Sequence, residues 1–95
     1  MSNRDEYVRK MQVKLVEWNT EINMLIARAS EVTADVKNEY NEQIESLKLK
    51  LANAKVKIEA LQQAGDNAWD DMKTGFEHSK TAIIAAIDAA RSRFR

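Results

Sequence analysis

Apolar side chains recur at alternating spacings of three and four residues through the first third of the chain. The positions are Val8, Met11, Leu15, Trp18, Ile22, Leu25, Ala29 and Val32. This spacing is typical of the apolar seam of a coiled coil. It predicts a long helix that carries one apolar stripe.

The seam continues into the second third of the chain after one change of register. Val36, Tyr40 and Ile44 are spaced by four and four, and the alternation then resumes. The resumed positions are Ile44, Leu47, Leu51, Ala54, Ile58 and Leu61. Because neither glycine nor proline interrupts this stretch, we predict one continuous helix from about residue 3 to about residue 64. The wider spacing rotates the seam or alters the supercoil locally.

A break in the helix is predicted at Gly65–Asp66. Glycine ends a helix by taking the left-handed conformation just beyond it, and Asp66 can cap the helix that follows. A second helix is expected over about residues 67–94, with apolar residues at helical spacing. These residues are Trp69, Met72, Phe76, Ile83, Ile87, Ala90 and Phe94.

Composition supports an all-α fold. The chain has 95 residues with no cysteine, no proline and two glycines, which leaves little turn chemistry for a β-sandwich or barrel. The absence of cysteine removes disulfide scaffolds and zinc ribbons. We predict a single helical coiled-coil domain over residues 1–95, in which a long helix is followed by a shorter antiparallel helix. This helical hairpin is expected to assemble as a coiled coil or helix bundle.

A second, weaker apolar stripe lies off the main seam of the long helix. It comprises Val13, Val16, Met24, Ala27, Leu49, Ala52, Val56 and Ala60. A two-stranded coil buries only one seam, so two stripes indicate a bundle of three or more helices.

The second predicted helix is shorter than the first, and this difference in length predicts an association surface. The second helix would cover the first back to about residue 36, which leaves the seam of residues 8–32 without a partner in the same chain. An exposed stripe of this length predicts self-association or docking on another protein. The predicted interface comprises Val8, Met11, Leu15, Trp18, Ile22, Leu25 and Val32. The predicted hairpin core comprises Ile44, Leu47, Leu51, Ile58, Leu61, Trp69, Met72, Phe76, Ile83, Ile87 and Phe94.

Chemically reactive side chains are sparse. His78 is the single histidine and there is no cysteine, so neither a catalytic triad nor a metal site is expected. Asp70 and Asp71 are adjacent, so on a helix they point in different directions. The 15 basic and 15 acidic residues give zero net charge and no overall attraction to nucleic acid. We expect no enzyme activity, no metal, no cofactor and no nucleic-acid partner.

The sequence also bears on membranes and location. No apolar run approaches the roughly 20 residues of a membrane span, and the first residues lack the apolar run of a signal peptide, so a soluble, cytoplasmic protein is expected. Residues 79–94 combine Ile83, Ile84, Ile87 and Phe94 with a basic end and could instead lie on a membrane surface. Packing in a hairpin core is the commoner use of such a stripe.

Several motifs are shared with a known family. They are Arg-Asp-Glu-Tyr-Val at residues 4–8, Leu-Val-Glu-Trp-Asn-Thr-Glu-Ile at residues 15–22, Ala-Trp-Asp-Asp-Met-Lys-Thr-Gly at residues 68–75 and Ser-Arg-Phe-Arg at residues 92–95. With these motifs, nearly the whole chain resembles a family of small bacterial proteins called coiled-coil domain-containing proteins. The resemblance implies no activity and supplies no functional residues.

These observations together favour one function. We expect a non-enzymatic structural or assembly protein that self-associates, docks on a larger protein complex, or does both through coiled-coil surfaces. The alternative is a membrane-surface or lipid-binding helical protein.

Overall fold

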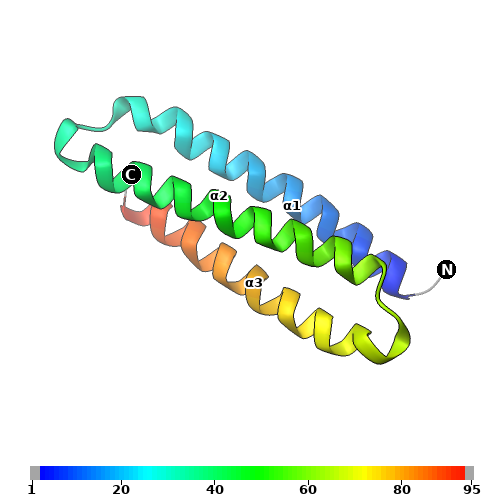
Figure 1. Cartoon of the computed structure of the whole chain (residues 1–95). Coiled ribbons are helices and arrows are strands. Elements are labelled where there is room, and N and C mark those ends of the chain that lie inside the picture. Colours follow the sequence, from blue (N-terminus) through cyan, green and yellow to red (C-terminus); the bar gives the residue numbers. More distant parts are fainter. Residues whose placement is uncertain (1–2, 94–95) are drawn as a thin grey trace.

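The computed structural model describes residues 3–93, which form three α-helices. They are α1 (Asn3–Arg28), α2 (Ala34–Gln62) and α3 (Asp66–Arg93). The helices lie side by side in a bundle 50 Å long and 20 Å wide, with α2 antiparallel to both α1 and α3 (Figure 1). The all-α fold class is therefore confirmed. The predicted two-helix hairpin is wrong, because the chain turns twice.

The first turn divides the predicted long helix in two. Residues Ala29–Glu31 form a short 3-10 helix, and Val32 and Thr33 are extended before α2 begins. The prediction of one helix over residues 3–64 is wrong for a physical reason. Ending a helix disrupts a few backbone hydrogen bonds, whereas folding α1 back buries a whole apolar seam. Each buried Leu, Ile or Met side chain contributes about 1.5–3 kcal/mol, so burial outweighs helix continuity.

The core lies along the axis of the bundle and takes residues from all three helices. Its buried members are Val8, Met11, Trp18, Ile22, Leu25, Tyr40, Ile44, Leu47, Ala54, Ile58, Leu61, Trp69, Phe76, Ile83, Ile87 and Ala90. Leu15, Leu51, Val32 and Val36 are partly buried against this core. α2 is the central helix, because it packs along both α1 and α3.

Met72 and Phe94 of the predicted hairpin core are not among the buried core residues described above. Met72 is 38% exposed, so its assignment to the core is wrong. Its neighbours in the stripe, Trp69 and Phe76, fill the space between the helices instead. Phe94 lies outside the described residues.

The second turn joins α2 to α3 through residues 63–65 and adopts no left-handed conformation. Among residues 3–93 no glycine has a positive φ, so the expected left-handed role of Gly65 is wrong. The last turn of α2 tightens instead, with Gln63 N–H donating to the Ala60 carbonyl over 3.1 Å. The Gly65 carbonyl then accepts the first backbone hydrogen bonds of α3, from Ala68 and Trp69.

Within residues 3–93, none of the helices combines the length and the apolar character that a membrane span requires.

Candidate protein interface

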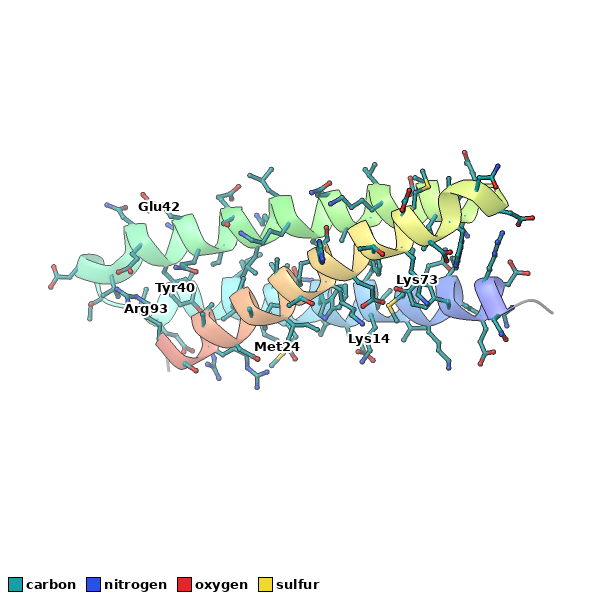
Figure 2. The ribbon with its side chains drawn as sticks, turned by 90° about the horizontal axis from the view of Figure 1, so that it is seen from below. Lys14, Met24, Tyr40, Glu42, Lys73 and Arg93 are labelled. Carbon is teal, nitrogen blue, oxygen red and sulfur yellow. The ribbon has the colours of Figure 1, made fainter. Side chains whose placement is uncertain are left out.

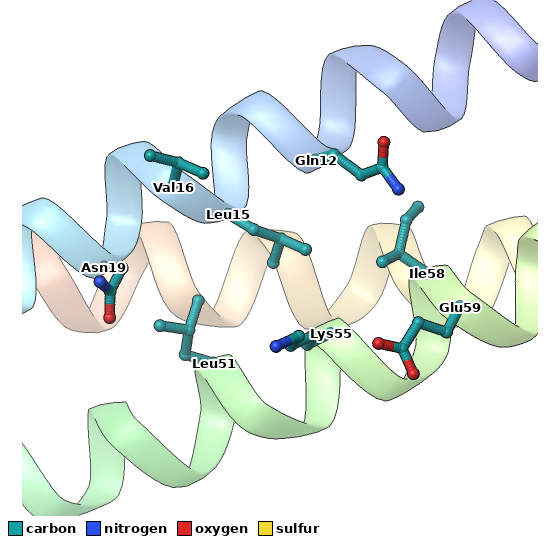
Figure 3. A pocket seen from close by; sticks show the side chains of 8 residues that line it. All are labelled: Gln12, Leu15, Val16, Asn19, Leu51, Lys55, Ile58 and Glu59. Carbon is teal, nitrogen blue, oxygen red and sulfur yellow. The ribbon is translucent and has the colours of Figure 1, made fainter.

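A groove runs between α1 and α2 on one face of the bundle. It has a volume of about 410 Å³, and α3 passes behind it (Figure 3). It is lined by Gln12, Leu15, Val16 and Asn19 from α1 and by Leu51, Lys55, Ile58 and Glu59 from α2. Apolar side chains from both helices therefore meet in the groove, and polar side chains from both helices flank them.

The groove exists because polar residues stand beside the seam of α1. Gln12 precedes Leu15 by about one helical turn and Asn19 follows it by about one turn. Because both side chains are polar, neither covers Leu51 of α2 with apolar atoms. Leu15 and Leu51 are consequently only partly buried. Val16 is 66% exposed at the edge of the groove. An apolar floor with an apolar edge is a surface that a protein helix can cover.

The weaker apolar stripe of the sequence faces outward. Val13 is 56% exposed on α1, and Leu49 and Val56 are 72% and 63% exposed on α2. Met24 projects from the outer side of α1 (Figure 2) and is also exposed. In the sequence this stripe indicates three or more helices, and the described residues form three α-helices. The residues of α1 and α2 that are buried between these helices belong to the main seam and not to this stripe.

The residues predicted as an interface lie inside the molecule. Five of them are buried, namely Val8, Met11, Trp18, Ile22 and Leu25, and Leu15 and Val32 are partly buried against the core. The inference that residues 8–32 lack a partner within the chain is wrong, because it depended on the long helix. The turn at residues 29–33 returns the chain along α1, so α2 and α3 cover its seam.

Side chains of α1 and α3 meet at the end of the bundle where α1 begins. The Tyr7 hydroxyl donates a hydrogen bond to the Glu77 carboxylate. The Tyr7 ring packs edge-on against Trp69 and Phe76, at centroid distances of 6.1 and 6.4 Å. Arg4 forms an ion pair with Asp66 at 2.7 Å. We call Tyr7, Trp69, Phe76 and Glu77 the α1–α3 clasp.

The clasp perturbs the titration of both of its polar members. Burial raises the pKa of Tyr7 above its ordinary value, and the hydrogen bond to Glu77 and the negative charge of Glu77 raise it further. Burial also opposes ionisation of Glu77. Hydrogen bonds from Lys80 and Tyr7 and the charges of Lys80 and Lys73 outweigh this effect, so the pKa of Glu77 is lowered. The clasp thus holds an ionised Glu77 and a neutral Tyr7.

The clasp was not foreseen in the sequence. Tyr7 precedes Val8 at the beginning of the seam, and Glu77 follows Phe76, so each adjoins a predicted core position. Their approach could be inferred only once α1 was known to lie parallel to α3. The apolar pattern therefore marked the neighbours of Tyr7 and Glu77 as core positions in their own helices. That these two side chains meet could not be predicted without the turn between α1 and α2.

The opposite end of the bundle is more polar. A hollow of about 540 Å³ is lined by Arg28, Asp88, Arg91 and Ser92. Arg91 pairs with Glu21 at 3.6 Å, which links α1 to α3 at this end as well. Tyr40 and Arg93 lie at this end as well (Figure 2). Burial raises the pKa of Tyr40.

Across residues 3–93, no group of three or more His, Asp or Glu side chains is placed to hold a metal ion. His78 is exposed on α3. Comparison with protein-family models, curated proteins and solved structures finds no match for the chain.

Proposed function

We propose that the protein is a non-enzymatic helical assembly protein that binds an amphipathic α-helix of a protein partner in the α1–α2 groove. The observation that carries this proposal is the partly exposed apolar floor of Leu15 and Leu51 beside the exposed Val16. Apolar side chains that line a groove between two helices form a surface on which the apolar face of a partner helix can pack. The membrane-facing alternative has less support, because Ile83 and Ile87 are buried between the helices.

The charges beside the groove specify the partner helix further. Lys55 and Glu59 are one helical turn apart on the α2 wall. A matching helix would carry an apolar ridge with an acidic residue opposite Lys55 and a basic residue opposite Glu59. Such rim pairs contribute about 0–1 kcal/mol each and chiefly fix orientation.

The face is large enough for a specific interface. A standard protein–protein interface buries about 800 Å² on each partner. The groove face belongs to a bundle 50 Å long and 20 Å wide, so one docked helix with its flanking contacts can reach this area. The proposal therefore does not require the bundle to open.

A matched pair of valine variants tests the proposal. Val16→Lys places a charge at the edge of the groove, whereas Val13→Lys places the same charge on α1 outside it. Tagged forms of the wild type and both variants are purified from the native source at low salt, and co-purifying proteins are identified by mass spectrometry. We expect a protein that binds the wild type and Val13→Lys and is lost with Val16→Lys. The same set of proteins with all three chains would contradict the proposal.

A further inference from the structure

The apolar seam of α1 and α2 is symmetric about the first turn. Three pairs of core positions lie at equal distances from Thr33: Val8 and Ile58 at 25 residues, Leu15 and Leu51 at 18 residues, and Ile22 and Ile44 at 11 residues. Two antiparallel helices related by a two-fold axis bring together residues that are equally far from that axis. The same stretches of seam can therefore meet inside one chain or between two copies.

The first turn differs from a helix chiefly at two backbone angles. Val32 has φ −84° and ψ 156°, and Thr33 has φ −71° and ψ 159°. Both φ angles are close to the helical value of about −63°, so only the two ψ angles separate this turn from a helix. Rotation at these two residues, with relaxation of the adjoining 3-10 turn, would join α1 to α2 as one helix.

Few local features fix the turn in its folded form. The segment Ala29–Thr33 contains no glycine or proline, and no described residue has a positive φ. Thr33 precedes α2 at the capping position, yet its side chain makes no capping hydrogen bond. The main feature that holds the turn is the burial of the α1 seam, and the seam of a second copy can supply the same burial.

We propose that two copies of this chain exchange α1 to form a two-fold symmetric dimer. In this dimer α1 and α2 of each copy form one helix over residues 3–62, and the two long helices run antiparallel with their centres near Thr33. α1 of one copy then occupies the position on α2 and α3 of the other copy that its own α1 occupies in the monomer. Exchange of identical elements in this way is a low-cost route to dimers, because few new contacts are needed.

The exchange re-forms the contacts of the monomer between chains. Tyr7 of one copy donates its hydrogen bond to Glu77 of the other, and the α1–α2 groove is built from both copies. The dimer is therefore compatible with the proposed partner binding and does not depend on it. It differs from the monomer in shape, because a helix of residues 3–62 is about 90 Å long at 1.5 Å per residue.

Two substitutions at Thr33 are expected to shift the equilibrium in opposite directions. Thr33→Pro suits the observed φ of −71° and the extended Val32 before it, but it disrupts a continuous helix. Thr33→Ala favours the continuous helix, because alanine has a higher helix propensity than threonine. Each dimer carries the substitution twice, once in each long helix, so by sedimentation equilibrium we expect Thr33→Pro to raise the dimer dissociation constant on the order of ten-thousandfold and Thr33→Ala to lower it. Equal dissociation constants for the two variants, or monomers only for the wild type and Thr33→Ala up to millimolar concentration, would overturn the proposal.

A distance measurement separates exchange from any other dimer. Spin labels are attached to Glu6→Cys and Gln62→Cys in one chain, which is natively free of cysteine, and the labelled chain is refolded with a tenfold excess of unlabelled chain. In the monomer the two labels lie near each other at one end of the bundle, because Asp5 and Gln62 line the same hollow. In the exchanged dimer they are about 80 Å apart along one helix. We expect the short distance to be lost in the dimer fraction of Thr33→Ala and kept in Thr33→Pro. A Thr33→Ala dimer that keeps the short distance would contradict exchange, while leaving binding in the groove unaffected.

Discussion

At the scale of single residues, Glu77 couples the α1–α3 contact to pH. Its carboxylate accepts hydrogen bonds from Tyr7 and Lys80 and lies among positive charges, so its pKa is lowered in the folded state although burial acts in the opposite direction. A group whose pKa is lower when folded stabilises the protein above its unfolded pKa. That contribution is lost as the pH falls through the folded value.

We predict that Glu77→Gln lowers the melting temperature at pH 7 and that this deficit shrinks as the pH falls toward 3. The deficit begins to shrink when the unfolded carboxyl takes up its proton, near about pH 4, and it closes as the pH falls through the lowered pKa of Glu77 in the folded protein. Thermal unfolding followed by circular dichroism between pH 7 and pH 3 measures the difference. Glu59→Gln, at an exposed position on α2 for which no such contact is described, serves as the matched control. A Glu77→Gln deficit that stays constant over this pH range would show that the carboxylate charge is not what stabilises the clasp.

Gly75 offers a second test at this scale, because nothing in the fold requires glycine there. It lies inside α3, its φ is not positive, and a Cβ atom built on it meets no other atom within 4 Å. Gly75→Ala is therefore expected to raise the free energy of unfolding by about 1 kcal/mol. Urea denaturation measures the gain. A loss of stability would indicate that α3 approaches another helix at this position, as it would in an assembly.

At the scale of the helices, the sequence pattern predicted which face of each helix is buried better than it predicted where each helix begins and ends. The alternating spacing identified Ile22, Ile44 and Phe76, and all three are buried. It missed the turn at Ala29–Thr33, because this turn has no glycine, no proline and no positive φ, and its local signals are weak: Thr33 at the capping position and Asp35 in the first turn of α2. The turn is selected by burial between distant parts of the chain, which a local pattern does not contain. The groove was missed for the same reason, because its two walls come together only after that turn.

The orientation of α2 is tested by two leucines that are two residues apart. Leu47 is 1% exposed and Leu49 is 72% exposed. We expect Leu47→Glu to destabilise the protein by more than about 4 kcal/mol, since it buries an unpaired charge in place of a core side chain. Leu49→Glu should change the free energy of unfolding by less than about 0.5 kcal/mol. Urea denaturation of both variants measures this contrast, and similar losses for the two would mean that both faces of α2 are covered.

At the scale of the whole molecule, the three helices share one core, so they are expected to unfold together. Trp18 lies on α1 and Trp69 lies on α3, and both are largely buried. The core residues of α2, which packs along both of their helices, belong to the same core as the two tryptophans. A small domain with a single contiguous core usually unfolds in one cooperative transition.

The two tryptophans allow this cooperativity to be measured directly. In Trp69→Phe the fluorescence reports on α1 through Trp18, and in Trp18→Phe it reports on α3 through Trp69. At micromolar concentration we predict that, within each variant, the fluorescence and circular dichroism transitions in urea coincide. Loss of the Trp18 signal before the loss of helicity would show that α1 separates while α2 and α3 stay folded. Coincident transitions would mean that exchange of α1 between copies passes through a largely unfolded chain, so that the dimer, once formed, interconverts slowly with the monomer.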